Sequence, residues 1–196
     1  MLMLKTHFSY HHKPDVASRR TFTLKDKFFT FFRLFGRRNI KIKENTIIGK
    51  NVIFRLTDDA KIEIGNNSII DHDVSFYLTK PKPFLQIGNH VAISKGTVIA
   101  CKSIMQIGDY TRIATNVVIR DNTHKFSANK LLINTDAEIK EIIIGKNVWI
   151  GDKVIIFPGV KIGDNAIISA GSIVTSEVRA NTIVAGQPAR FIKKVE

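Results

Sequence analysis

The chain is poor in cysteine and in long apolar runs. Cys101 is the only cysteine among 196 residues, so no disulfide can form within one chain. No run of 18 consecutive apolar residues occurs, which argues against a transmembrane helix. The apolar start Met1–Leu4 stops at Lys5 and is too short for the core of a signal peptide. We therefore expect a cytoplasmic protein.

Acidic residues are also scarce. Seventeen Asp and Glu stand against 30 Lys and Arg, which leaves a formal charge of +13. Such a balance favours an anionic partner: a phosphorylated cofactor, an anionic membrane surface or a nucleic acid. The sequence has no zinc-finger spacing, no RNP-like aromatic motif and no recognition-helix signature, so we expect no nucleic-acid partner.

What the chain does contain is several series in which an isoleucine, valine or phenylalanine recurs every six residues. The clearest series are Ile87, Ile93 and Ile99; Ile107, Ile113 and Ile119; and Ile144, Ile150, Ile156, Ile162, Ile168 and Val174. The fifth residue of each hexad is usually small or β-branched, and glycine often follows the anchor. A period of six fits neither an amphipathic helix nor a strand carried across turns. It is typical of a solenoid.

Each hexad suits one short strand and a corner, with the anchor pointing inward. Three hexads close a triangular coil of 18 residues, so Ile144 should lie beneath Ile162 and Ile150 beneath Ile168. Glycine and asparagine near the corners accept the positive φ that a bend often needs. The pattern predicts an all-β fold in which successive coils pair as parallel sheet.

The repeat divides the chain into three parts. Residues 45–178 form the solenoid, 1–44 an N-terminal segment and 179–196 a C-terminal cap. Within the N-terminal segment, residues 22–35 place phenylalanine and leucine at helical spacing among lysines and arginine. This short amphipathic helix could pack on the solenoid or a neighbouring subunit. Alternatively, residues 22–38 could rest on the inner face of an anionic membrane.

Three interruptions break the repeat. They fall at residues 77–86, at 101–105 and, as the largest, at 120–143. Insertions at the corners of a solenoid become surface loops and often line the binding face. A long ordered loop is more often functional than idle. We therefore expect chemistry near the loop 120–143.

The pattern resembles the hexapeptide-repeat transferases over roughly residues 45–190, and this implies a left-handed parallel β-helix. Acetyltransferases of the sugar, maltose and nodulation-factor type carry a catalytic histidine at the start of the long loop, about 25 residues before a Val-Trp-Ile-Gly motif. Here these are His124 and Val148–Gly151. The resemblance implies that His124 is a general base. Histidine suits that role near neutral pH, since its ordinary pKa is about 6.5.

Asp121 could orient the His124 ring, although a backbone carbonyl could equally do so and Asp121 could instead be a turn residue. No cysteine or serine nucleophile is needed if the acyl group passes directly to the acceptor. The γ-class carbonic anhydrases share the fold but require three zinc histidines, two of them close in sequence. No such pair exists among the repeat-region histidines, and no metal site is expected.

The donor side carries a second part of the resemblance. Ala170–Thr175 reads Ala-Gly-Ser-Ile-Val-Thr, and Gly186–Arg190 reads Gly-Gln-Pro-Ala-Arg. In the family these motifs line the groove for the pantetheine arm and approach the phosphates of the coenzyme. The resemblance thus implies acetyl-CoA as donor. The residues that it assigns to coenzyme binding are Trp149, Gly151, Ala170, Thr175 and Arg190.

On the acceptor side the chain departs from the maltose-type branch. The position of an acceptor-binding asparagine is occupied here by Ser94. The chain looks closer to acetyltransferases of bacterial capsule or O-antigen. The resemblance implies a homotrimeric O-acetyltransferase acting on a sugar hydroxyl, with each site shared by two subunits. N-acetyl transfer to an amino sugar or antibiotic, and a non-catalytic scaffold, remain as alternatives.

Overall fold

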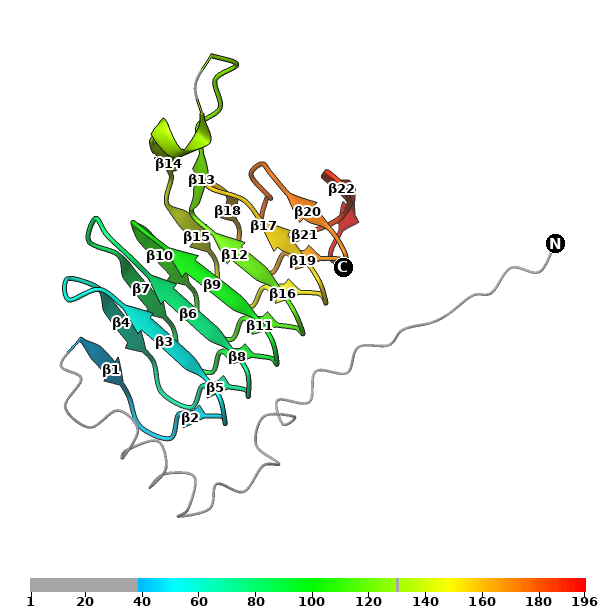
Figure 1. Ribbon diagram of the computed structural model, residues 1–196. Coiled ribbons are helices and arrows are strands. Elements are labelled where there is room, and N and C mark those ends of the chain that lie inside the picture. Colours follow the sequence, from blue (N-terminus) through cyan, green and yellow to red (C-terminus); the bar gives the residue numbers. More distant parts are fainter. Residues whose placement is uncertain (1–38, 130) are drawn as a thin grey trace.

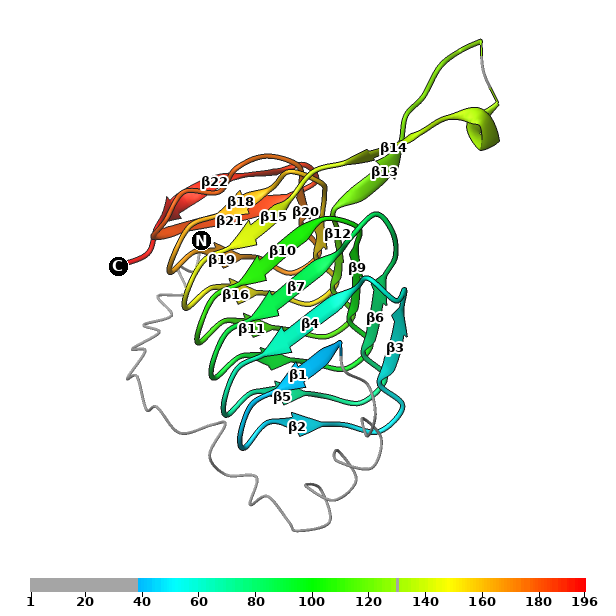
Figure 2. The same ribbon diagram turned by 90° about the vertical axis from the view of Figure 1, so that its left-hand side faces the viewer.

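The protein forms a three-sided prism of short parallel strands, described by a computed structural model for residues 39–129 and 131–196 (Figures 1 and 2). In Figure 1 the chain crosses the near face from right to left and the far face from left to right as it climbs, which is a left-handed winding. The all-β left-handed solenoid is thereby confirmed. The helix expected within residues 22–35 lies outside the described residues.

Three sheets form the sides of the prism, and the chain visits them in the order A, B, C in each coil. Sheet A contains β1 (Ile40–Ile42), β4 (Lys61–Ile64), β7 (Phe84–Ile87), β10 (Ile104–Ile107), β15 (Ile142–Ile144) and β18 (Lys161–Ile162). Sheet B contains β2 (Ile47–Ile48), β5 (Ile69–Ile70), β8 (Ala92–Ile93), β11 (Arg112–Ile113), β16 (Trp149–Ile150), β19 (Ile167–Ile168), β21 (Thr182–Gly186) and β22 (Ala189–Lys194). Sheet C contains β3 (Ile53–Leu56), β6 (Ser75–Leu78), β9 (Val98–Cys101), β12 (Val118–Arg120), β17 (Ile155–Ile156) and β20 (Ile173–Val174).

The apolar anchors stack inside the prism. Ile144 pairs with Ile162 in sheet A, and Ile150 pairs with Ile168 in sheet B. These are the neighbours that the 18-residue spacing predicts. All four side chains are at most 2% exposed, and burying one isoleucine contributes about 1.5–3 kcal/mol. Since each coil packs only on its neighbours, the stacking itself supplies the core.

The corners between the sheets explain the small and polar residues of each hexad. At the edge between sheets A and B, the buried Thr111 hydroxyl donates a hydrogen bond to the backbone oxygen of Gly145 at 2.9 Å. Asn147, Asn165 and Asn181 adopt φ of 53°, 58° and 55° at this edge. Their side-chain amides form a ladder of 2.9 Å hydrogen bonds from coil to coil. The predicted positive φ at corners is confirmed.

The last coil is closed by a pair of strands with opposite directions. β21 pairs parallel with β19, and β22 turns back to pair antiparallel with β21. Residues 179–196, which the sequence predicts to be a cap, thus add the last two strands to sheet B.

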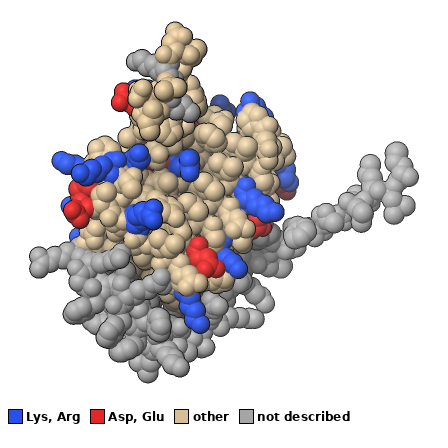
Figure 3. Space-filling model, viewed as in Figure 1, with Lys and Arg blue, Asp and Glu red and all other residues tan. Residues whose placement is uncertain are grey.

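The outer face of sheet C is mostly uncharged, as Figure 3 shows. Five of its six strands begin with an apolar residue in one shared register, and none of these residues is buried: Ile53, Val98, Val118, Ile155 and Ile173. Lysine and arginine side chains are scattered over this view rather than joined in one stripe. No helix within the described residues is long and apolar enough to span a membrane.

Candidate active site

The largest interruption of the repeat is an arm, residues 121–141, that leaves the prism between sheets C and A (Figures 1 and 2). It contains β13 (Asn122–His124), a short 3-10 helix η1 (Leu132–Asn134) and β14 (Ala137–Ile139). β13 and β14 pair antiparallel, so the arm begins as a hairpin. The predicted surface loop at 120–143 is confirmed.

His124 is the last residue of β13 and lies opposite Ala137. The next residue closes the hairpin, since the Lys125 N–H donates to Asp136 O at 3.1 Å. The His124 side chain is exposed, and no residue in the described ranges hydrogen-bonds to its ring. Both ring nitrogens are therefore available to a ligand, as a general base requires.

The arm carries its own ion pair beside this strand. Lys140 Nζ lies 2.6 Å from Glu138 Oε1, and this contact lowers the pKa of the Glu138 carboxyl. Both groups are exposed, so the pair is screened by solvent and contributes little to stability.

Asp121, at the root of the arm, does not face the histidine. Its carboxylate is fully buried and accepts hydrogen bonds from the turn of the preceding coil, Lys102–Ser103. The possibility that Asp121 orients the His124 ring is therefore excluded by this geometry. The carboxylate holds two coils together.

The interruptions of the repeat gather at one edge of the prism, the C–A edge. Residues 79–83 connect β6 to β7, residues 102–103 connect β9 to β10, and the arm connects β12 to β15. These connections follow one another up the same edge in Figure 1. Insertions at one set of corners thus make the edge irregular, while the other two edges stay regular.

Trp149 lies on a different side of the molecule. It opens β16 in sheet B, points outward and is 46% exposed. Its register neighbour on one side is Arg112, and on the other Ile167. Ser94 follows β8, which is separated from β16 by one strand, β11, in the same sheet.

Gly151, directly after Trp149, has a packing reason to be glycine. A Cβ there would lie 2.6 Å from the backbone nitrogen of Ala170. Gly151 is buried, and its N–H donates to Ile168 O at 2.8 Å. Its predicted role toward a coenzyme stays a prediction, while the close approach of two coils accounts for the residue type.

The two C-terminal motifs lie against each other. The Gln187 side-chain amide donates to Gly171 O at 2.7 Å, and Gly186 N–H donates to Ser172 Oγ at 3.2 Å. Ala170 is exposed at this B–C edge. Arg190 lies on β22, opposite Ala185, and is exposed. The fold therefore joins two segments that the sequence separates by ten residues.

Within one chain the predicted site residues fall on two edges. Ser94, Gly151 and Ala170 lie at the B–C edge, with Trp149 and Arg190 on sheet B, whereas His124 and Thr175 lie at the C–A edge. The width of sheet C separates the two edges, about 13 Å for a four-residue strand at about 3.3 Å per residue. One chain alone does not bring His124 to Trp149.

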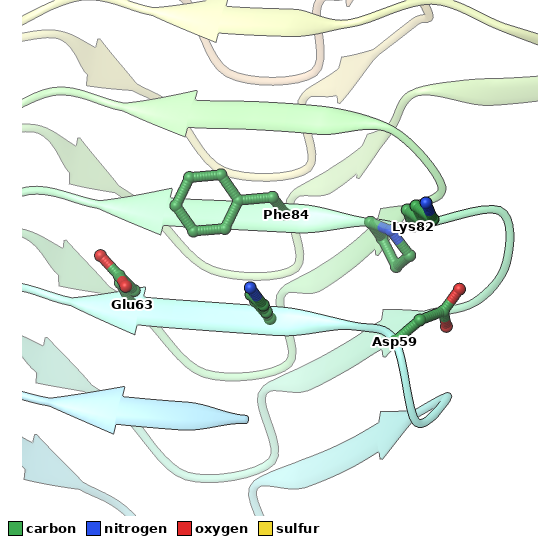
Figure 4. A pocket seen from close by; sticks show the side chains of 6 residues that line it. Asp59, Glu63, Lys82 and Phe84 are labelled. Atoms are coloured by element: carbon green, nitrogen blue, oxygen red, sulfur yellow. The ribbon is translucent and has the colours of Figure 1, made fainter. Parts of the chain in front are cut away.

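A shallow hollow of about 590 Å³ lies on sheet A. Figure 4 shows Phe84 lying along β7, with Asp59 and Lys82 toward the connecting loops and Glu63 on β4. None of the predicted site residues lines this hollow. Within the described residues, no group of three His, Cys, Asp or Glu side chains could hold a metal ion.

One residue beside the predicted site was missed by sequence reasoning. Arg112 adjoins Trp149 in sheet B, and its guanidinium donates to His90 O at 2.6 Å. The repeat register could have found it, since Ile113 stacks on Ile150 and the preceding residues must then be neighbours. The repeat register could not predict the hydrogen bonds of Asp121, because they join the root of the arm to a turn, and both lie outside the regular repeat.

Comparison with known proteins shows which proteins this chain is similar to. Residues 141–176 match the family described as hexapeptide repeat of succinyl-transferase. The chain is 39% identical to the galactoside O-acetyltransferase of Escherichia coli K12 over 111 residues, which are 57% of this chain and 54% of that protein. The chain is thus similar to acetyltransferases, and its residues 141–176 carry the hexapeptide repeat.

A second curated relative extends the comparison. The chain is 32% identical over 114 residues to WbbJ of E. coli K12, named for O-acetyl transfer in lipopolysaccharide biosynthesis; the match covers 54% of this chain and 58% of WbbJ. The chain thus spans little more than half the length of the curated relatives it matches.

Solved structures agree over a larger share. AntD, an N-acyltransferase from Bacillus cereus that was crystallised as a single-residue variant with dTDP and coenzyme A, superimposes with a TM-score of 0.71 at 26% identity; the match covers 80% of this chain and 84% of AntD. A galactoside acetyltransferase in complex with coenzyme A superimposes with a TM-score of 0.57 at 31% identity, covering 80% of this chain and 65% of that chain.

Proposed function

We propose that the protein is an acetyl-CoA-dependent O-acetyltransferase acting on a sugar hydroxyl in bacterial surface polysaccharide biosynthesis, with His124 as general base. The observation that carries the proposal is the state of His124. It is an exposed histidine whose ring has no hydrogen-bond partner among residues 39–129 and 131–196, held on a hairpin whose root is anchored in the prism. That arrangement presents a base to a bound hydroxyl group.

The chemistry needs no covalent enzyme intermediate. His124 removes the proton from the acceptor hydroxyl as its oxygen attacks the thioester carbonyl. The C–S bond then breaks, and the imidazolium returns the proton to the departing thiolate. The products are the acetyl ester and free CoA. The only thiol of the chain, Cys101, is buried, and burial raises its pKa to about 12, so it is no competing nucleophile.

We further propose that the active site lies between subunits of a homotrimer. The arm carries Phe126, Leu131 and Ile133, which are 81%, 72% and 88% exposed in the single chain. Apolar side chains on a protruding arm favour contact with another protein surface. An arm that reaches sheet B of the next subunit would place His124 near that subunit's donor-side residues. Such a contact would bring together the site residues that one chain keeps on separate edges.

On the donor side, we assign the pantetheine arm to the surface near Trp149, Gly151 and Ala170, with Thr175 at the end of the same motif. Two observations support this assignment: the Gln187–Gly171 contact joins the two C-terminal motifs, and the pairing of β22 with β21 puts Arg190 on the same sheet as Trp149. Arg190 is exposed, and β22 ends in Lys193 and Lys194. Guanidinium and ammonium groups are suited to the coenzyme phosphates.

On the acceptor side, Ser94 is half-buried at the B–C edge and is assigned to a sugar hydroxyl. A second candidate function, N-acyl transfer to an amino sugar, is favoured by the superposition on AntD, one structure of which contains dTDP-4-amino-4,6-dideoxyglucose and coenzyme A. The same base serves both reactions. We propose a cytoplasmic location, at the inner membrane face if residues 22–38 bind lipid; these residues lie outside the described ranges.

The test is CoA release by purified protein with acetyl-CoA and a panel of sugars, amino sugars and nucleotide sugars. We expect His124→Ala to lower kcat by about 10²–10⁴-fold, the usual contribution of a general base. Mass spectrometry of the product distinguishes an ester from an amide.

His90→Asn is the matched control. His90 is a corner residue with φ of 57°, and asparagine occupies equivalent corners in other coils. This variant should keep full activity. If sugar-dependent release survives in His124→Ala, the assignment of the base is wrong. A protein that neither binds acetyl-CoA in a thermal-shift experiment nor releases CoA would instead be a scaffold.

A further inference from the structure

The root of the arm is fastened by one side chain, Asp121. Its carboxylate accepts hydrogen bonds from Lys102 N at 2.9 Å to each oxygen, from Ser103 N at 2.7 Å and from Ser103 Oγ at 2.9 Å. Asn122 Nδ2 adds a fifth contact at 3.0 Å. The residue is completely buried. A buried carboxylate is tolerated only where donors replace its water shell, and here the backbone and side chains of three residues do so.

The backbone of Asp121 belongs to the same junction. Its N–H donates to Ala100 O at 3.2 Å in the preceding coil, and its carbonyl accepts from Lys140 N at 2.9 Å. The second contact closes the neck of the arm, because Lys140 directly follows β14. Lys140 O in turn accepts from Gly159 N at 3.3 Å, in the coil above. Asp121 therefore ties both ends of the arm to the solenoid.

We propose that Asp121 is a positioning residue, which fixes the root of the arm against the preceding coil and thereby sets where His124 meets the substrate. His124 lies three residues further along, and β13 begins immediately after Asp121. Because the hairpin projects from the prism, a change in the position of its root also displaces His124. A displacement of about 1 Å at a catalytic group can cost about 100-fold in rate.

This inference rests on the proposed role of His124, and its first test does not depend on activity. Hydrogen exchange of the arm amides is compared between wild type and Asp121→Asn. The substitution keeps the size of the side chain but replaces one acceptor oxygen with an NH2 group, which is itself a donor. Some of the four donors around Asp121 therefore lose their acceptor. We expect faster exchange at Lys125 and Lys140, whose amides bond across the arm, with unchanged exchange in coils after residue 160.

Kinetics then separate positioning from general stability. We expect Asp121→Asn to lower kcat at least about 10-fold with KM for acetyl-CoA within about twofold, because the donor groove does not involve the arm root. Ser103→Ala removes only one of the donors and should lower kcat less. Ser103→Ala also tests the proposal if Asp121→Asn does not fold.

Asp109→Asn is the matched control. Asp109 is also a corner carboxylate that accepts a backbone N–H from the preceding coil, Asn89 N at 2.8 Å, but it lies at the A–B edge away from the arm. It should leave kcat and arm exchange unchanged. The proposal is overturned if Asp121→Asn and Ser103→Ala both leave arm exchange and kcat at the level of Asp109→Asn. A failure of the proposed function appears differently, as full activity in His124→Ala.

Discussion

At the scale of single residues, the root of the arm contains two polar groups with opposite environments. The Asp121 carboxylate is buried and accepts several hydrogen bonds, whereas the His124 ring, three positions later, is exposed and has no hydrogen-bond partner in the part of the chain that the structure describes. The buried charge also affects its neighbour. Burial, and next the charge of Asp121, raise the pKa of the Cys101 thiol to about 12, against hydrogen bonds from backbone oxygens that lower it.

Cys101 should therefore be inert in the folded protein. A raised pKa means that the reactive thiolate is almost absent below about pH 9. Ellman's reagent at about pH 8 should label far less than one thiol per chain in native protein and one thiol in guanidinium chloride. Fast native labelling would contradict the buried environment. The result also decides whether a thiol reagent can follow CoA release without background from the enzyme.

At the scale of elements, glycine at the corners between strands has two different causes. At some corners the next coil lies too close for a Cβ atom, and at others the backbone adopts a positive φ. A Cβ on Gly151 would lie 2.6 Å from Ala170 N and 2.9 Å from Ala170 Cα, both backbone atoms. A Cβ on Gly171 would meet no atom within 4 Å, but the backbone of this residue adopts a φ of +70°. Both glycines lie at corners of the solenoid, but the space available explains Gly151 and the backbone conformation explains Gly171.

These causes predict different responses to substitution. Gly151→Ala must push two coils apart, and we expect a loss of about 2 kcal/mol or more in the free energy of unfolding. Gly171→Ala should lose only about 1 kcal/mol, and Gly171→Asn less, because asparagine tolerates the left-handed conformation. Asn116 already does so at an equivalent corner, with φ of 58°. Urea unfolding of the three variants measures the order, and equal losses for the two alanine variants would contradict it.

At the scale of the whole molecule, the prism separates the proposed base from the proposed donor surface. His124 belongs to the C–A edge and Trp149 to sheet B, with sheet C between them. A closed ring of subunits brings two different faces of one chain together at each interface. The arm of one subunit can then complete the groove of the next.

A mixing experiment tests this arrangement. His124→Ala and the double variant Trp149→Ala, Arg190→Glu should each be nearly inactive alone. Trimers assembled from equal amounts of both should recover activity at about a quarter of their sites, because half of the arms and half of the grooves are intact. Differently tagged copies allow the mixed trimers to be purified. No recovery in verified mixed trimers would place the whole site within one chain.

Much of the fold was predictable because a solenoid repeats one local rule. The six-residue period predicted that Ile144 stacks on Ile162, and the structure confirms it. The long gap after Ile119 predicted the arm and thus drew attention to His124. Periodicity reports which way a side chain points, since inward and outward positions alternate in a fixed order along each strand.

Contacts outside that order depended on tertiary structure. The sequence left open whether Asp121 orients the histidine, and only the fold shows its carboxylate bound to the turn at Ser103, 18 residues away. The same holds for Arg190, which reaches sheet B because β22 folds back on β21. The sequence by itself determined the solenoid, its register and the arm, because stacking anchors is a nearest-neighbour effect. Tertiary structure alone decided how the arm is anchored and which edge carries each predicted site residue, because loops meet partners that no period specifies.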